Sequence, residues 1–125
     1  MTDCPFCNPD DILLENDLAF AKYDLYPVSP GHVLVVPKRH TASWFDLTPA
    51  EQTAMFALAN QAKKLLDERY APAGYNLGIN CGEAAGQTIM HVHLHIIPRY
   101  IGDVPNPRGG IRAVIAAKQD YTHRV

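Results

Sequence analysis

Histidine alternates with apolar residues along residues 91–98, which read HVHLHIIP, and this run constrains the fold more than any other part of the chain. Because side chains alternate across a β-strand, the run predicts a strand that places His91, His93 and His95 on one face. Its apolar residues then form the opposite, core-facing side. Packing alone favours β-branched and aromatic residues on a half-buried strand, so a row of imidazoles indicates a functional site.

The rest of the chain predicts further short strands and one long helix. Residues 18–23 and 32–36 predict a hairpin-like pair joined by a proline-bearing turn region, and residues 75–80 predict another strand before the histidine run at 91–97. Thr48, Pro49 and Glu51 combine an N-cap, a first-turn proline and a capping-box glutamate, so we expect a helix from there to about Tyr70. The connection over residues 81–90 is too short for a crossover helix, which predicts an antiparallel α+β domain.

The expected helix carries one apolar stripe and an additional apolar patch. The stripe consists of residues that share one helical face, namely Met55, Leu58, Ala62, Leu65 and Leu66. Residues 54–59 are apolar without a break, which is wider than one stripe requires. We therefore expect a second buried face there, covered by a partner subunit.

The composition limits the partners and the compartment. A chain of 125 residues fits a single domain over residues 1–125, with residues 1–10 as an N-terminal arm and 113–125 as a C-terminal tail. A net charge of -2 provides no basic field for a nucleic acid polymer. No apolar run approaches the roughly 20 residues of a membrane span, and residues 1–9 lack the pattern of a secretion signal. We therefore expect a cytoplasmic protein without a membrane partner.

Two chemistries use a row of imidazoles, and metal binding is the first. Neutral imidazole is the commonest metal ligand, but at about 3.3 Å per residue the Cα atoms of His91 and His95 would lie about 13 Å apart. Two of these histidines could share one ion, whereas all three could reach a single ion only with strain. The second chemistry is nucleophilic catalysis, in which one imidazole attacks phosphorus and a neighbour assists the leaving oxygen. Residues 82–88 supply glycines and the donors of Gln87 and Thr88, which suit a phosphate.

These motifs resemble the histidine triad (HIT) family, whose signature is His-φ-His-φ-His-φ-φ with φ apolar, and residues 91–97 match it at every position. Residues 30–40 resemble the family's central strand, and residues 86–88 its phosphate loop. The resemblance implies a HIT-like antiparallel sheet with one long helix, which dimerises into a shared extended sheet. It also implies a nucleotide hydrolase that cleaves phosphoanhydrides or phosphoramidates at the α-phosphate, with the dinucleoside polyphosphate hydrolases of the fragile histidine triad type as the most similar branch.

The resemblance also implies roles for single residues. His93 resembles the nucleophile that forms a nucleotidyl-histidine intermediate, and His95 the residue that contacts the phosphate and the leaving group. Gln87 resembles the α-phosphate ligand, and Gly86 and Thr88 accompany it in the phosphate loop. Asp24 resembles the acidic group that hydrogen-bonds the ribose hydroxyls, and Asn80 an active-site asparagine. A third histidine where the uridylyltransferase branch has glutamine favours hydrolysis.

Cys4 and Cys7 form a second constellation, Cys-x-x-Cys. Three cysteines are too few for a secreted disulfide framework, and no strand-like run precedes the pair as a redox motif would require. Zinc takes four ligands, so two thiolates leave two positions for histidine. In zinc-bearing bacterial members of the resembled family these positions match His40 and His91, which implies a structural zinc. Two unligated cysteines in a loose arm are the alternative.

Other polar residues carry further expectations. We expect Cys81 to be a small packed residue, His32 a hydrogen-bonded core histidine, and His123 a solvated residue in a poorly ordered tail that starts at Tyr121. Arg99, Arg108 and Arg112 could meet a polyphosphate at the edge of the site. Two other function classes stay open: a histidine-ligated metalloenzyme, and a nucleotide-binding protein with vestigial catalysis.

Overall fold

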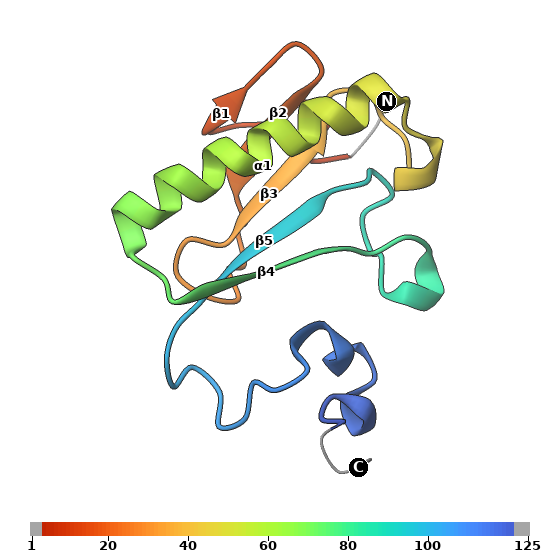
Figure 1. Ribbon diagram of the computed structural model, residues 1–125. Helices are drawn as coiled ribbons and strands as arrows, with labels where there is room; N and C mark the ends of the chain where they lie inside the picture. Colours follow the sequence, from red (N-terminus) through yellow and green to blue (C-terminus); the bar gives the residue numbers. More distant parts are fainter. Residues whose placement is uncertain (1–3, 122–125) are drawn as a thin grey trace.

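Five strands form one antiparallel sheet in the computed structural model, which describes residues 4–121 (Figure 1). The strands are β1 (Leu14–Glu15), β2 (Ala19–Tyr23), β3 (Val33–Pro37), β4 (Gly74–Ile79) and β5 (Leu94–Arg99), and their order is β1-β2-β3-β5-β4. Helix α1 (Pro49–Tyr70) joins β3 to β4, and short 3-10 helices lie in the loops: η1 (Trp44–Asp46), η2 (Glu83–Ala85), η3 (Gly110–Val114) and η4 (Ala116–Lys118). The predicted α+β architecture with one long helix is confirmed.

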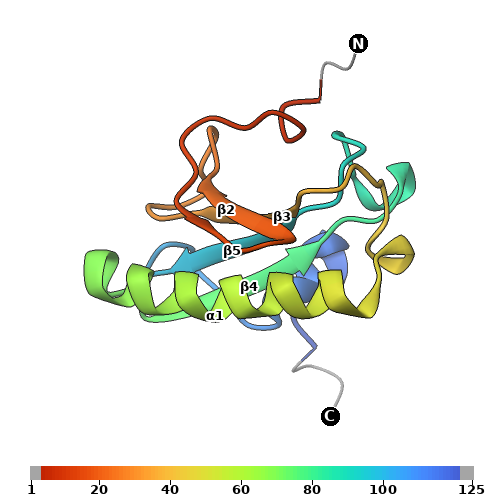
Figure 2. The ribbon, with the colours of Figure 1, turned by 90° about the horizontal axis from the view of Figure 1, so that it is seen from above.

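The sheet separates α1 from the N-terminal arm, as the view in Figure 2 shows. On one face, the buried stripe of α1, which includes Met55, Leu58 and Leu66, packs against Ala21 and Val35 of the sheet. On the other face Phe6 of the arm packs with Phe20, Leu34 and Val36. Because alternate residues of β2 and β3 point to opposite faces, the two small cores share the same two strands. The second face is covered only in part, and the site lies there.

Helix α1 begins where the sequence predicts it. The Thr48 hydroxyl accepts the backbone N–H of Glu51 at 3.1 Å, and the Glu51 carboxylate accepts the backbone N–H of Thr48 at 2.9 Å, which is a capping box. Two further hydrogen bonds from the Arg39 guanidinium, at 2.8 and 2.9 Å, lower the pKa of Glu51 to about 2. Since Arg39 follows β3 closely, this ion pair holds the start of α1 beside His40.

The hairpin-like pair is confirmed, because β2 and β3 are antiparallel neighbours in register from Ala19 opposite Pro37 to Tyr23 opposite Val33. Their connection, residues 24–32, also contacts β5, because the Ser29 hydroxyl donates to the carbonyl of Pro98. The end of β2 and the start of this connection border the cavity described below.

The histidine run differs from its prediction. β5 starts at Leu94, three residues later than expected, so His91 and His93 precede the strand and only His95 lies within it. The β3–β5 ladder ends where Leu94 faces Val35, and the backbone N–H of Val92 bonds instead to the carbonyl of Thr41 at 2.8 Å. The predicted start of the strand is therefore wrong, because tertiary hydrogen bonds draw the first two histidines out of the ladder.

The predicted alternation of histidines and apolar residues holds nevertheless. Phe6 of the arm contacts the rings of His91 and His93, and His95 lines the same cavity as His93. The apolar residues between them lie in the core on the other face.

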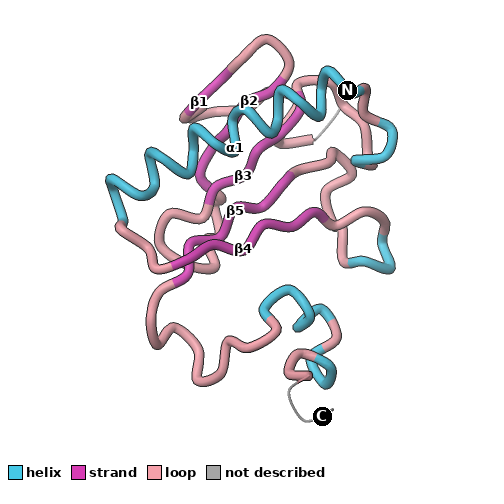
Figure 3. The backbone as a smooth tube through the Cα atoms, viewed as in Figure 1, coloured by secondary structure: helices cyan, strands magenta, loops and turns pink. Residues whose placement is uncertain are grey.

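After β5 the chain consists of loops with the short helices η3 and η4, which lie beyond the edge strand β4 (Figure 3). Tyr121 is the last described residue, and its ring lies 5.0 Å from the Arg112 guanidinium. The expected position of His123 lies outside the described residues. No helix within residues 4–121 has both the length and the apolar character needed to cross a bilayer.

Candidate functional site

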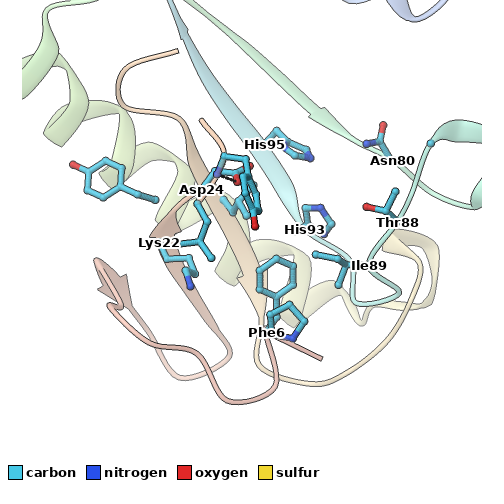
Figure 4. Close-up of a pocket in the computed structure, with 14 residues that line it drawn as sticks. Phe6, Lys22, Asp24, Asn80, Thr88, Ile89, His93 and His95 are labelled. Carbon is cyan, nitrogen blue, oxygen red and sulfur yellow. Dashed lines mark hydrogen bonds between the residues drawn. The ribbon is translucent and has the colours of Figure 1, made fainter. Parts of the chain in front are cut away.

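A cavity of about 440 Å³ opens on the face of the sheet that carries the arm (Figure 4). Six of the residues predicted for the nucleotide site line it: Asp24, Asn80, Gly86, Thr88, His93 and His95. The other lining residues come from the arm, from β2 and the loop after it, from β3 and from the loop before β5: Pro5, Phe6, Lys22, Tyr23, Leu25, Tyr26, Leu34 and Ile89. The fold thus brings together segments that are up to about 90 positions apart in the sequence.

His93 is oriented by the main chain. Its Nδ1 lies 2.9 Å from the carbonyl oxygen of His91. A carbonyl oxygen only accepts hydrogen bonds, so Nδ1 carries the ring proton and the other nitrogen, Nε2, holds a lone pair when the ring is neutral. His93 is nearly buried and lines the cavity. It therefore presents a nucleophilic nitrogen there without needing a separate base.

His95 is oriented by a different partner, His32. The backbone N–H of Val28 donates to His32 Nδ1 at 3.0 Å, so a neutral His32 must carry its proton on Nε2. His32 Nε2 lies 3.0 Å from His95 Nδ1 and 3.5 Å from a carboxylate oxygen of Asp24. His95 Nδ1 is thus an acceptor, and its Nε2 carries the proton. The chain Val28, His32, His95, which we call the relay, gives His95 an N–H to offer to the cavity.

Both histidines of the relay are neutral at neutral pH. Burial, together with the neighbouring His93 and His32, lowers the pKa of His95 to about 4. Burial also lowers the pKa of His32, against an opposing effect of Asp24. The rings of His93 and His95 lie 5.0 Å apart. The cavity therefore holds a lone pair and an N–H side by side, on two histidines of opposite tautomer.

Asp24, His32 and His95 also place three potential ligand atoms within 4.8 Å of one another, which resembles a metal site. A metal would need the lone pair of His32 Nε2, and a neutral ring would then carry its proton on Nδ1. That proton would point at the N–H of Val28, which is a donor itself. The hydrogen bonds of this cluster therefore fit a proton-donating relay and oppose a metal ion.

Gln87 turns its side chain to the backbone and does not itself line the cavity, so its predicted contact with the phosphate stays a prediction. Its side chain is buried, accepts the N–H of Gly82 at 2.8 Å and donates to the carbonyls of Ala42 and Ile89 at 2.7 and 3.1 Å. All of its polar atoms are thus engaged with the backbone behind the loop. A direct phosphate contact would require Gln87 to exchange these partners. The groups of this loop that line the cavity are Gly86, at a positive φ of 93° that favours glycine, and Thr88.

The second predicted constellation is assembled as expected. Cys4, Cys7, His40 and His91 each offer one ligand atom, and these atoms lie within 4.8 Å of one another. Cys4 Sγ lies 3.3 Å from His91 Nδ1, and Cys7 Sγ lies 3.1 Å from His40 Nδ1 and 3.7 Å from His91 Nδ1. Tetrahedral zinc with its usual bond lengths separates such ligand atoms by about 3.5–3.8 Å. We call this group the metal cluster.

The tautomer of His91 tests whether the metal cluster fits a metal ion. His91 Nε2 lies 2.7 Å from the carbonyl oxygen of Pro37, so it donates a hydrogen bond and Nδ1 keeps the lone pair. That lone pair belongs to the nitrogen nearest both sulfur atoms. A histidine that donates its outer N–H to a carbonyl is the usual arrangement of a metal ligand. The residues present therefore fit zinc.

Three residues of the site were missed or given another role by the sequence analysis. His32 is a satisfied, buried histidine as expected, but its partner is the triad residue His95. Phe6 packs its ring 5.1 Å from that of His93, and Lys22 lines the cavity. The position of Phe6 between the two cysteines could have predicted its place, because a site that uses both cysteines must bring Phe6 near His91. The position of Lys22 could have been predicted from its spacing of two from Asp24, which places both side chains on one face of an extended chain.

Arg99, Arg108 and Arg112 do not line the cavity. Arg99 donates to both carboxylate oxygens of Asp103, at 2.7 and 2.8 Å, and to Asn76. Arg112 donates to the carbonyl of Lys118. Within one subunit these arginines thus lie outside the cavity lining, and their contact with a polyphosphate stays a prediction. Cys81 is half-buried and lies outside the metal cluster.

Comparison with known proteins places these features in a family. A family model described as HIT domain matches residues 6–102. The chain is 39% identical over 92 residues to the bis(5'-nucleosyl)-tetraphosphatase [asymmetrical] of Schizosaccharomyces pombe, covering 74% of this chain and 50% of that protein. It is 42% identical over 96 residues to the bis(5'-adenosyl)-triphosphatase of Dictyostelium discoideum, covering 77% and 64%. The chain thus spans only about half to two thirds of the length of these two relatives.

A solved structure supports the same assignment over more of the chain. A Zn-bound histidine triad family protein from Mycobacterium smegmatis is 32% identical, with a TM-score of 0.73 over 92% of both chains. The family match contains every strand of the sheet, the whole of α1 and all residues of the relay. The chain therefore belongs to the HIT-domain family.

Proposed function

We propose that this protein is a nucleotide hydrolase that cleaves at an α-phosphate through a nucleotidyl-histidine intermediate on His93. One observation carries the proposal: His93 and His95 face one cavity with opposite tautomers, which the carbonyl of His91 and the side chain of His32 impose. Attack on phosphorus needs a lone pair, and an N–H donor stabilises the charge that develops on the leaving group. The cavity offers both from neutral side chains.

In the first step His93 Nε2 attacks the α-phosphorus. A nitrogen–phosphorus bond forms while the bond from phosphorus to the leaving oxygen or nitrogen breaks. His95 keeps its proton and donates a hydrogen bond from Nε2 to the leaving atom; a phosphate departs as its anion, and an amine takes a proton from solvent. In the second step water attacks phosphorus, the nitrogen–phosphorus bond breaks with its electron pair returning to His93 Nε2, and the proton of the water passes to solvent. His93 keeps its Nδ1 proton on the carbonyl of His91 throughout, so both histidines return to their starting state.

The rest of the cavity divides into a phosphate end and a nucleoside end. We assign Asn80, Gly86 and Thr88 to the phosphate, with Gln87 holding their loop from behind. Asp24 is assigned to the ribose hydroxyls: its Oδ1 accepts the N–H of Tyr26 at 2.9 Å, and the side chain is 17% exposed at the cavity. A carboxylate has acceptor capacity left for hydroxyl donors. The names of the relatives favour dinucleoside polyphosphates over nucleoside phosphoramidates.

We further propose that the metal cluster holds a structural zinc ion. When bound, zinc would cross-link the arm to the loop before β5 through Cys4, Cys7, His40 and His91. Its contribution to the site would be indirect, because Phe6 between the two cysteines packs against His91 and His93 at ring distances of 5.9 and 5.1 Å. The two thiolates stay reduced in the cytoplasm, where we place the protein.

We also propose that the chain forms a homodimer with a continuous sheet. β4 is an edge strand, and Leu77 on it is 49% exposed. In the apolar patch at residues 54–59, Phe56 is 54% exposed. An exposed apolar patch and an unpaired strand edge suit a second copy of the chain.

Sedimentation should give a dimer for the wild-type protein. Phe56→Glu should shift the protein towards monomer, whereas Lys64→Glu, on the exposed side of α1, should not. A monomeric wild type at micromolar concentration would contradict this assignment.

The function is tested by trapping the intermediate. Wild-type enzyme given an α-labelled dinucleoside polyphosphate and quenched in alkali should retain label on the protein, and an acid quench should release it, because phosphoramidates are acid-labile. His93→Ala should lower turnover to near background while nucleotide still binds, because it removes the nucleophile. His95→Ala should retain a slow reaction, lowered about 10²–10⁴-fold by loss of the N–H that assists the leaving group.

Two results would overturn the proposal. One is wild-type turnover by His93→Ala, which would leave the histidines as a structural row or a binding site with vestigial catalysis. The other is rapid product release with no label on alkali-quenched protein. Immediate loss of activity on chelation, with the fold intact, would favour the metalloenzyme instead.

A further inference from the structure

Lys22 is the one cavity residue whose charge the proposed reaction does not use. It lies in β2, is only 8% exposed and lines the cavity. Within residues 4–121 its ammonium has no carboxylate or hydrogen-bond acceptor in reach, whereas Lys38 and Lys63 each pair with a carboxylate, at 2.8 and 2.7 Å. The stem of Lys22 is buried, whereas its Nζ, which has no protein partner among these residues, is not among the buried polar atoms and keeps contact with solvent. An acceptor supplied by a ligand in the cavity would take the place of that water.

The register of the sheet places Lys22 relative to the chemistry. Lys22 pairs with Leu34 of β3, and Leu34 pairs with His95 of β5, so the three residues form one row across adjacent strands. Neighbouring strands are about 4.8 Å apart, which puts the Cα atoms of Lys22 and His95 about 10 Å apart on the same face. Leu34 lies between them as an apolar floor.

The surroundings of Lys22 are apolar, unlike those of the phosphate end. Phe6 and Ile89 lie below the row in Figure 4, whereas Asn80 and Thr88 lie on the far side of His93 and His95. Asp24, two residues along the chain from Lys22, stands between the two ends. A nucleotide with its α-phosphate at His93 and its ribose at Asp24 therefore extends its base over Leu34 towards Lys22.

We propose that Lys22 reads the edge of the base and selects a 6-oxopurine, guanine or hypoxanthine, over adenine. An ammonium group only donates hydrogen bonds. Guanine and hypoxanthine present two adjacent acceptors, O6 and N7, which is the edge that lysine contacts most often on guanine. Adenine has an amino group in place of O6, and two donors would then face each other. This inference rests on the proposed function and names the substrate class within it.

A phosphate is the other anionic group that a lysine could bind. Lys22 is separated from the phosphate end by Leu34 and by two strand spacings, and its neighbours are apolar. A ligand site of this kind, apolar with a single donor, is typical of base recognition. The two assignments differ in one measurable property, because a phosphate contact would act equally on every base.

The test compares bases while holding the leaving group constant. Guanosine, inosine and adenosine 5'-phosphoramidates with one common amine are compared by kcat/KM in the wild type, Lys22→Met, Lys22→Arg and the control Lys63→Met. We expect guanosine and inosine to exceed adenosine by roughly tenfold or more in the wild type and in Lys63→Met. Lys22→Met should bring the ratio to about one, and Lys22→Arg should restore a preference. Binding of GMP and AMP by calorimetry should show the same ratios.

The outcomes separate this inference from the proposed function. Equal kcat/KM values for the three bases in the wild type, or a ratio unchanged in Lys22→Met, would overturn the role of Lys22 and leave the hydrolase intact. An equal loss for all bases in Lys22→Met would assign Lys22 to phosphate and overturn base recognition. If no substrate turns over, the proposed function fails, and the GMP-to-AMP binding ratio still decides the role of Lys22. Thermal unfolding of each variant identifies any misfolded protein, and Lys22→Gln then replaces Lys22→Met.

Discussion

The metal cluster on one side, and the two relay histidines with Asp24 on the other, are both small groups of residue types that commonly bind metals, yet their hydrogen bonds prepare them for opposite tasks. In the metal cluster, His91 donates its Nε2 proton to the carbonyl of Pro37 and turns a lone pair towards two sulfur atoms. In the relay, His32 accepts the N–H of Val28 and turns its own N–H towards His95. The carbonyl of Pro37 keeps the ring proton of His91 on its outer nitrogen, whereas the N–H of Val28 leaves the ring proton of His32 on its inner nitrogen.

This difference shows that residue type alone does not define a metal site. The metal cluster and the group of Asp24, His32 and His95 both hold potential ligand atoms within 4.8 Å of one another. They differ in the main-chain group that hydrogen-bonds the outer nitrogen of the imidazole. That group selects the tautomer, and therefore whether a lone pair or a proton faces inward. His93 obeys the same rule, since the carbonyl behind it leaves a lone pair on the catalytic side.

The largest expected effect comes from breaking the metal cluster. Wild-type protein purified without chelator should contain about one zinc per chain. Cys7→Ser should lose that zinc and melt roughly 10 °C or more lower, because metal binding stabilises only the folded state. Cys81→Ser, at the cysteine outside the cluster, is the matched control and should keep both. Metal content and thermal unfolding are the measurements.

Zinc content also tests the contrast between the metal cluster and the relay. The double variant Cys4→Ser, Cys7→Ser should bind no zinc, because the relay offers no inward lone pair on His32. Zinc that remains in the double variant and disappears when His32→Gln is added would show that the relay is a metal site after all.

The next largest effect is expected from breaking the relay. His32→Phe keeps a ring in place but removes the N–H that orients His95, so kcat should fall about 10–100-fold. The loss should grow as the pKa of the leaving group rises, since the developing charge on a poor leaving group depends most on the hydrogen bond from His95. His32→Gln, which can still donate to His95, should recover part of the rate, and zinc content should not change. A rate loss that is equal for all leaving groups would reduce His32 to a packing role.

The smallest effect is expected from pH. The pKa of His95 is about 4 in the folded protein, lowered from 6.5 mainly by burial, so between these values the unfolded chain binds more protons. The free energy of unfolding should therefore fall as pH drops from about 7 towards 4, and His32 and His91, whose pKa values burial also lowers, add to the trend. Urea unfolding at several pH values measures the slope, which should be smaller in His95→Phe. A stability that stays level or rises on acidification would contradict the neutral relay.

Local patterns were sufficient for much of the fold. The Thr48 cap, the strand pair around residues 24–32 and the length of α1 depend on residues close in sequence, and all three were predicted. The start of β5 was not, because Val92 bonds to Thr41, about 50 positions away, and no local pattern reports such a partner. The hydrogen bond from Gln87 to the carbonyl of Ala42 also joins two distant loops, so no local pattern reports it either.

The sequence by itself determined which residues could take part: the histidine run, the Cys-x-x-Cys pair, Asp24 and the loop at residues 82–88. Only the tertiary structure decided what each imidazole presents, because a tautomer depends on a hydrogen-bond partner that arrives from another part of the chain. Pro37 behind His91, Val28 behind His32 and His32 behind His95 are such partners. The same holds for Lys22, whose place at the far end of the cavity follows from strand register rather than from its neighbours in the sequence.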